Sequence, residues 1–354
     1  MRTNGVLNDN REMKNVTTVS NIDLKIFQDI RSACQPVVMR GFVADWPIVA
    51  AAQQGDEMLV ASVAANASDA PLTYALGEPE IEGRFHYTHD VQHLNFVRKQ
   101  TTLRSFLELL LAEKLSPTGC ALAAQGVALQ NCLPGFSHVH AMPLLPDTVL
   151  PRMWICNAAK VATHNDELEN IAYVATGRQR FTLFPPEAVA DLYMGPFELT
   201  PGGTPISMVH VTAPDHERYP RYGRALEVAQ VADLEPGDAL YIPYQWYHHV
   251  EAFDPINILV NYWWDPARQD LGSPWDALLH GIIAYRSLPP DQRRAWKAAF
   301  DYYVFLQNGD PGAHLPPEAR GVLGQESGRD IAQFKQDLRA NLDPEGRGKV
   351  GPFG

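Results

Sequence analysis

The hydrophobic positions along this chain follow two different periods. In residues 22–35 and 102–114, apolar side chains recur every three or four positions, as on one face of an amphipathic helix. Between about residues 150 and 264, short apolar runs are separated by Gly, Pro and Asp turns, which is typical of β-strands. Several short strands without a long helix between them predict a β-sandwich or a β-barrel.

The helical period returns in the last part of the chain. Residues 273–288, 289–305 and 330–342 each carry an apolar stripe, and this stripe is either core packing or a dimer interface. We therefore expect three regions. A flexible N-terminus spans residues 1–18, a β-rich domain with N-terminal α/β elements spans 19–268, and a helical segment spans 269–354.

Composition and charge narrow the class of protein. The chain has 354 residues, of which 45% are hydrophobic, and its 29 Lys and Arg against 41 Asp and Glu give a net charge of −12. An acidic surface disfavours nucleic acid and anionic membranes as partners. No signal-peptide pattern or long apolar run is present, so a cytoplasmic location is expected. The four cysteines are widely spaced, and we expect them to be buried thiols.

Candidate chemistry begins in "KVATHNDELEN", where His164 and Asp166 lie two positions apart. On a strand such residues share a face, so both side chains point at one spot. One more histidine from a distant strand would complete a facial triad that holds Fe(II) and leaves three coordination positions open. The run "PYQWYHHV" offers His248 and His249, of which strand alternation allows only one to face a cavity.

Other histidines are weaker candidates. His138 and His140, and also His86 and His89, have spacings that resemble metal motifs. Neither pair is accompanied by a carboxylate and a third ligand as His164 is, although His86 or His89 could line a substrate groove. The remaining isolated histidines are expected to be structural or surface residues.

Taken in order, five segments resemble a known family. They are "THNDELEN", "GRQRFTLFPPE", "PDHERYPRYG", "PGDALYIPYQWYHHV" and "NILVNYWW". The chain is similar over roughly residues 20–265 to the cupin-like JmjC-type oxygenases that depend on Fe(II) and 2-oxoglutarate, which include the asparaginyl hydroxylase that inhibits hypoxia-inducible factor. The resemblance implies a mainly β fold, a double-stranded β-helix or jelly-roll barrel, with the metal near its open end.

The resemblance also implies roles for single residues. His164 and Asp166 match the proximal metal ligands, and His248 matches the distal ligand, which leaves His249 facing the outer packing or solvent. Asn170 matches a pocket residue. Iron as Fe(II) and 2-oxoglutarate are the implied metal and cosubstrate, and dioxygen is the implied co-reactant.

The cosubstrate pocket both matches the family pattern and departs from it. Asn261 and Trp263 match pocket residues on the last strand, although Trp263 could equally be core. The family usually holds the distal carboxylate of 2-oxoglutarate with a Lys or Arg, and here that position is Gln179. Its two arginine neighbours should point away from its face. A tyrosine found in some members has no counterpart in residues 120–131.

Three functions follow as alternatives. The first is an Fe(II)- and 2-oxoglutarate-dependent dioxygenase that hydroxylates a protein side chain or a small amino-acid-like molecule, with a homodimer formed through the C-terminal helices. The second is a metal-containing binding or regulatory module that has weakened or lost 2-oxoglutarate binding, which Gln179 motivates. The third is a cupin-type isomerase or dioxygenase that uses no 2-oxo acid, but such sites commonly use more histidines.

Overall fold

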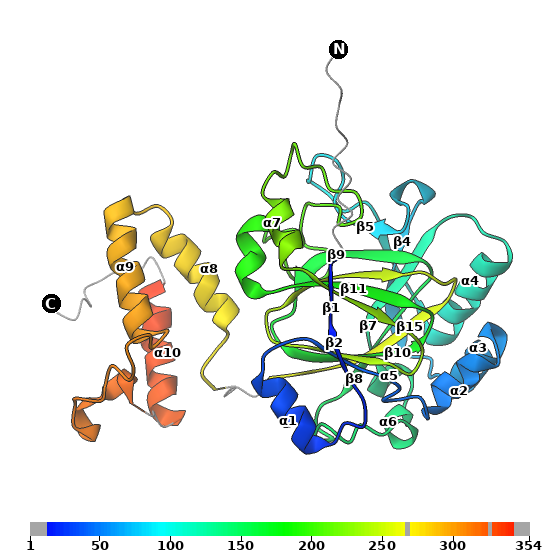
Figure 1. Ribbon diagram of the computed structural model, residues 1–354, viewed down its shortest axis with the longest axis horizontal. Coiled ribbons are helices and arrows are strands. Elements are labelled where there is room, and N and C mark those ends of the chain that lie inside the picture. The colour runs from blue at the N-terminus through cyan, green and yellow to red at the C-terminus, as the bar shows by residue number, and fades with distance from the viewer. Residues whose placement is uncertain (1–12, 266–269, 325–327, 343–354) are drawn as a thin grey trace, which may run out of the picture. The chain divides into compact units, whose positions relative to one another are not determined.

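The chain divides into two compact units, Met1–Asp265 and Pro266–Gly354 (Figure 1). The computed structural model describes residues 13–265, 270–324 and 328–342. Most of the N-terminus that was expected to be flexible, residues 1–12, lies outside the described part. Residues 14–19 contain two short strands, β1 (Lys14–Asn15) and β2 (Thr17–Val19), which pair with β12 (Gln230–Leu234) and β3 (Val37–Met39).

Two mixed sheets form the first unit. The six-stranded sheet has the order β1 (Lys14–Asn15), β12 (Gln230–Leu234), β11 (Gln179–Phe184), β14 (Tyr247–Ala252), β9 (Ala159–Asn165) and β5 (Arg84–Phe85). The nine-stranded sheet has the order β2 (Thr17–Val19), β3 (Val37–Met39), β13 (Ala239–Ile242), β10 (Glu169–Thr176), β15 (Asn257–Trp264), β8 (Pro151–Cys156), β7 (Ala121–Ala128), β4 (Pro71–Gly77) and β6 (Val97–Thr102).

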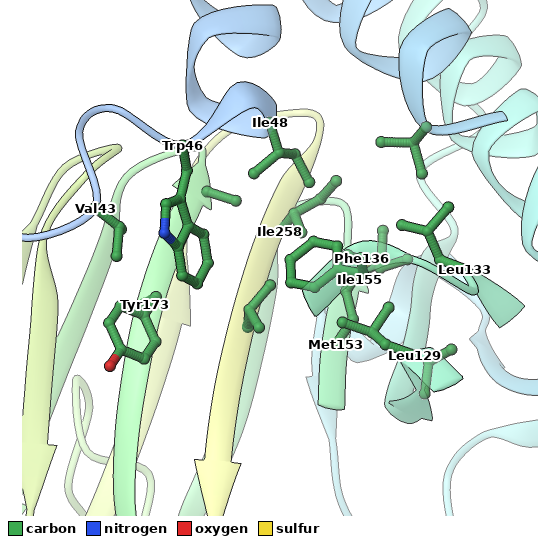
Figure 2. Packing of buried hydrophobic residues seen from close by; sticks show 14 of the residues in the cluster. Val43, Trp46, Ile48, Leu129, Leu133, Phe136, Met153, Ile155, Tyr173 and Ile258 are labelled. Carbon is green, nitrogen blue, oxygen red and sulfur yellow. The ribbon is translucent and has the colours of Figure 1, made fainter. Parts of the chain in front are cut away.

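Helices cover the outer face of the nine-stranded sheet. Trp46 stacks on Tyr173 with ring centroids 5.2 Å apart, and Phe136 lies in the same apolar cluster as Ile155 and Ile258 (Figure 2). The helices of the first unit are α1 (Leu24–Ser32), α2 (Pro47–Gln53), α3 (Asp56–Asn66), α4 (Leu103–Leu115), α5 (Leu129–Cys132), α6 (Phe136–Val139) and α7 (Tyr222–Glu227), with the short 3₁₀ helices η1 (Pro79–Ile81) and η2 (Pro186–Asp191).

A second apolar cluster fills part of the space between the two sheets. It joins Ala172 and Val174 of β10 to Phe181 of β11 and Trp246. Tyr173, between the two β10 residues, faces the helices instead, so the strand is buried on both sides and at every position. The expected mainly β, jelly-roll architecture with N-terminal helices is confirmed, and helices 22–35 and 102–114 are present as α1 and α4.

The second unit is helical. It contains α8 (Pro274–Tyr285), α9 (Pro290–Tyr303) and α10 (Gly328–Leu342), with the 3₁₀ helices η3 (Pro317–Ala319) and η4 (Gly321–Leu323). Several large apolar side chains on these helices are exposed, among them Leu278, Ile283, Trp296 and Leu338. No helix within the described residues has the length and apolar character that crossing a membrane requires.

The cysteines differ from the expectation of buried thiols. All four are free, but of these only Cys132 is buried, whereas Cys34 is exposed and Cys120 and Cys156 are half-buried. Cys34 has φ of +49° in the turn that follows α1, and this turn leaves its side chain at the surface.

An ion pair ties α1 to the first residue of β10. Arg31 donates two hydrogen bonds to Glu169, Nε to Oε2 at 2.8 Å and Nη2 to Oε1 at 2.7 Å. The Tyr241 hydroxyl donates a third to Oε2 at 3.0 Å. Because Glu169 is only 9% exposed, its carboxylate depends on these donors rather than on water. The pair anchors the strand that carries Asn170.

We expect Arg31→Met to lower the free energy of unfolding by about 1–3 kcal/mol, because it leaves a nearly buried carboxylate short of donors. Arg180→Met is the matched control. Arg180 makes a similar two-bond pair with Asp233, but both side chains are largely exposed. That substitution should cost less than about 1 kcal/mol. Urea denaturation measures the free energy of unfolding of both variants. Equal losses of stability would contradict the dependence of the buried Glu169 carboxylate on its hydrogen-bond donors.

Candidate metal centre

Three side chains from two distant parts of the chain, His164 with Asp166 and His248, meet at one end of the barrel. One ligand atom from each of His164, Asp166 and His248 lies within 4.8 Å of the others, and within the described residues this is the one such group of His, Cys, Asp or Glu. Nε2 of His248 is 3.7 Å from Oδ2 of Asp166, and the two imidazole centroids are 4.4 Å apart. His248 is buried, whereas the other two are half-buried.

Strand register creates this meeting. In the antiparallel pair β9–β14, His164 is the direct partner of His248. Side chains of opposed residues in such a pair are about 5 Å apart at Cβ, which is the separation that two imidazoles on one ion need. Asp166 comes directly after β9 ends at Asn165, so the chain can turn its carboxylate toward both rings.

A β-bulge in β9 decides which residues share the cavity. His248 and Val250 are two positions apart on β14, but their partners His164 and Val161 are three positions apart on β9. The extra residue reverses the alternation of β9, so Val161 and His164 both line the cavity. On a regular strand one of them would face outward.

Backbone carbonyls orient both imidazoles. Nδ1 of His164 donates to the carbonyl of Ala162 at 2.9 Å, and Nδ1 of His248 donates to that of Trp246 at 3.2 Å. Each Nε2 therefore keeps its lone pair, as a metal-binding histidine requires. Burial, helped by the nearby His164, lowers the pKa of His248 to about 4, so the ring is neutral at neutral pH.

A chain of hydrogen bonds ends on Asp166. Trp263 Nε1 donates to its Oδ2 at 3.1 Å, and Asn170 Nδ2 donates to the same atom at 3.3 Å. Asn261 Nδ2 donates to Oδ1 of Asn170 at 3.4 Å, and Trp154 Nε1 donates to Oδ1 of Asn261 at 3.0 Å. An indole N–H can only donate and a carboxylate can only accept, so every donor in the chain points toward Asp166.

A family model described as "Cupin-like domain" matches residues 23–270, more than half of the chain.

The chain belongs to the cupin-like domain family.

Relatives of this cupin-like chain include JmjC-type proteins, which confirms the expected resemblance. The chain is 34% identical over 142 residues to the HSPB1-associated protein 1 homolog of Danio rerio, covering 39% of this chain and 30% of that one. It is 35% identical over 112 residues to the lysine-specific demethylase JMJ31 of Arabidopsis thaliana, covering 31% and 20%. It is 32% identical over 151 residues to the human bifunctional peptidase and (3S)-lysyl hydroxylase JMJD7, covering 36% and 46%. The chain thus spans less than half of each.

The cupin-like barrel encloses a cavity that runs from the candidate metal centre to Gln179. Gln179 is 4% exposed and lines the cavity, while the neighbouring arginines point away, as strand alternation predicts. Arg178 pairs with Asp254 and Arg180 pairs with Asp233. Among the described residues that line the cavity there is no Lys, Arg or Tyr.

The remaining residues expected at the pocket, Asn170, Asn261 and Trp263, also line the cavity. Sequence reasoning missed Trp154 and Cys156, which line it from β8. Both follow from strand alternation in the run "PRMWIC", since Trp154 and Cys156 are two positions apart. The alternation is visible in the sequence, but the sequence does not show which face of β8 points into the barrel.

Three histidines outside the triad, His86, His140 and His249, are buried. His249 is buried on the outer side of β14, and its ring nitrogens lack a hydrogen-bond partner of normal geometry. His140 stacks on Phe136 at 3.9 Å and accepts a hydrogen bond from the backbone N–H of Ile48. His86 Nε2 lies 3.0 Å from the carbonyl of Ser207.

We expect His248→Leu to abolish Mn(II) binding, because it removes an inward imidazole and leaves two candidate ligands. His249→Leu is the matched control from the next position. It should leave Mn(II) affinity within about twofold and unfolding within about 1 kcal/mol, because it removes ring nitrogens that make no good hydrogen bond. Calorimetric titration of Mn(II) compares the two, and loss of binding in His249→Leu alone would reverse the assignment.

Trp263→Phe should weaken Mn(II) binding by about tenfold, because it removes a donor that orients the Asp166 carboxylate. Trp264→Phe is the control, since Trp264 faces α1 and packs 6.1 Å from Phe27. It should change stability without changing metal affinity. Equal affinities of the two variants would show that the indole N–H does not support the carboxylate.

Proposed function

We propose that this chain is an Fe(II)-dependent dioxygenase that uses a 2-oxo acid to hydroxylate a C–H bond of a protein side chain or of a small amino-acid-like molecule. His164, Asp166 and His248 are the proposed metal ligands. The observation that carries the proposal is the convergence of two imidazoles and one carboxylate, with ligand atoms within 4.8 Å of one another, at one end of a cavity.

The donor set fits iron. Two neutral imidazoles and one carboxylate are the ligands of a facial triad, and such a site leaves positions for a chelating 2-oxo acid and for dioxygen. Bound Fe(II) would supply the activation of dioxygen, which organic side chains do not provide. The protein supplies orientation: the carbonyls of Ala162 and Trp246 fix the rings, and Trp263 and Asn170 fix the carboxylate.

The overall reaction balances as follows. A 2-oxo acid loses its carboxyl carbon as carbon dioxide and takes one oxygen atom to become a carboxylic acid one carbon shorter. The second oxygen atom enters a C–H bond of the substrate as a hydroxyl group. For 2-oxoglutarate, the cosubstrate implied by the family, the acid formed is succinate. Apolar cavity walls such as Phe181, Val250 and Leu259 would keep bulk water from the reacting centre.

The cosubstrate-binding residues are proposed to be Asn170, Gln179, Asn261 and Trp263, all of which face the cavity. The relatives named for lysyl hydroxylation and lysine demethylation support a protein side chain as one substrate class. The acidic net charge of −12 supports a function away from nucleic acid and membranes, and a cytoplasmic location is proposed with it.

We propose further that residues 19–268 are the catalytic domain and that 269–354 form a dimerisation region. The exposed apolar side chains of α8, α9 and α10 support a homodimer through these helices. The second candidate function is a metal-binding regulatory module. It is favoured by the lack of a cationic residue among the described residues that line the cavity.

Anaerobically purified protein loaded with Fe(II) should release carbon dioxide from a 2-oxo acid in air when a panel of peptides and amino acids is supplied. His164→Ala should lower the rate to background, because it removes one of the proposed ligands, whereas His249→Leu should retain it. Carbon dioxide release from labelled 2-oxo acids is the measurement. Turnover that is undiminished in His164→Ala would exclude this site, and metal binding without any turnover would favour the regulatory module.

A further inference from the structure

The cavity has two ends: the metal end, at His164, Asp166 and His248, and the deep end, at Gln179. The two ends are built from different kinds of residue. Gln179 pairs with Ala252 on β14, and Leu183, four positions further along β11, pairs with His248. At about 3.3 Å per residue, Gln179 therefore lies about 13 Å from the level of the candidate ligands. A molecule that reaches from the metal toward Gln179 passes through the space between the two sheets.

The walls around this deep end are uncharged and mostly apolar. Ala252 pairs with Ala159 across β14 and β9, and both line the cavity together with Phe85, Cys156 and Ala123. Burial raises the pKa of the Cys156 thiol to about 12, so this side chain is also neutral. The deep end is thus mostly apolar, with the Gln179 amide in its wall.

That amide has no hydrogen-bond partner among the residues that the structure describes. The Gln179 side chain forms no hydrogen bond with any residue of the described ranges 13–265, 270–324 and 328–342, although it is 4% exposed. Its amide atoms are not among the fully enclosed polar atoms that lack a partner, and Gln179 lines the cavity, so the amide can bind a ligand there. Its NH₂ group can donate hydrogen bonds and its oxygen can accept them, but the amide brings no charge.

The neighbouring cations do not compensate. Arg180 lies on the opposite face of β11 and pairs with Asp233, and Arg178, just before β11, pairs with Asp254. A carboxylate at the deep end would therefore be removed from water without a counter-charge, which is strongly unfavourable. An uncharged group there would instead gain from burial against the alanines and Phe85.

Charge balance at the metal end leads to the same conclusion. Fe(II) and the Asp166 carboxylate together would carry one net positive charge, because an imidazole binds a metal ion in its neutral form. The single carboxylate of a monoacid neutralises that charge completely. A dicarboxylate such as 2-oxoglutarate would leave one negative charge in a cavity with no cation among its described lining residues.

We propose that this site prefers a 2-oxo acid with an uncharged side chain, such as 4-methyl-2-oxopentanoate or 2-oxohexanoate, over 2-oxoglutarate. This inference rests on the proposed function and names its cosubstrate class. The reaction has the same stoichiometry as with 2-oxoglutarate: 4-methyl-2-oxopentanoate, dioxygen and a C–H bond give 3-methylbutanoate, carbon dioxide and an alcohol. Gln179 acts as the residue that sets this preference.

Titration of each 2-oxo acid into the Mn(II)-loaded protein tests the preference by binding alone, without turnover. The wild-type protein should bind 4-methyl-2-oxopentanoate or 2-oxohexanoate about tenfold or more tightly than 2-oxoglutarate, the size of one missing charge-assisted contact. Gln179→Lys should tighten 2-oxoglutarate and weaken the neutral acids. Gln100→Lys, which adds the same charge at an exposed position of β6, should change neither.

Tighter binding of 2-oxoglutarate than of the neutral acids by the wild-type protein would overturn the inference and leave the proposed oxygenase standing. Failure of every 2-oxo acid to bind the Mn(II)-loaded protein would overturn both. Thermal unfolding shows whether Gln179→Lys is folded. If Gln179→Lys does not fold, the ratio of the wild-type affinities for the neutral acids and for 2-oxoglutarate decides whether the inference holds. If Gln179→Lys folds and still prefers the neutral acids, Gln179 does not set the preference.

Discussion

The candidate site depends on one local constraint, the antiparallel pairing of β9 with β14. This pairing places His164 opposite His248, and a one-residue bulge in β9 brings Val161 and His164 to the same face. A slip of one residue in the register would turn one of the two imidazoles away from the cavity. Because β14 lies between β9 and β11, the same register also sets where Gln179 lies relative to the histidines.

The second sheet contributes the groups that hold the carboxylate. Asn170 and Trp263 are direct partners across β10 and β15, and both donate to Asp166. β10 is held in turn by Glu169, whose carboxylate is bound by Arg31 of α1 and by Tyr241. A helix on the outer face is thereby connected to the metal end through a strand that is buried on both sides, so stability and site geometry share the same contacts.

The two ends of the cavity differ, with the candidate metal ligands at one end and Gln179 at the other. Membership of the cupin-like family accounts for the barrel that carries the candidate ligands. The deep end departs from the pattern that the resemblance implies, since Gln179 matches a position usually held by a Lys or Arg, and small apolar residues surround it. A fold does not fix the chemistry of its cavity, because a few inward side chains decide what can be buried there.

The sequence by itself determined the mainly β barrel, the helices of residues 22–35 and 102–114, and the candidate ligands His164, Asp166 and His248. Those follow from local period and from a resemblance carried by short motifs. Only the tertiary structure decided the bulge in β9, the donors Trp154 and Asn261 behind Asp166, and the apolar surroundings of Gln179. The physical reason is that the period of apolar residues indicates only which residues of a single strand share a face. Register and cavity walls arise from pairing between strands that are distant in sequence.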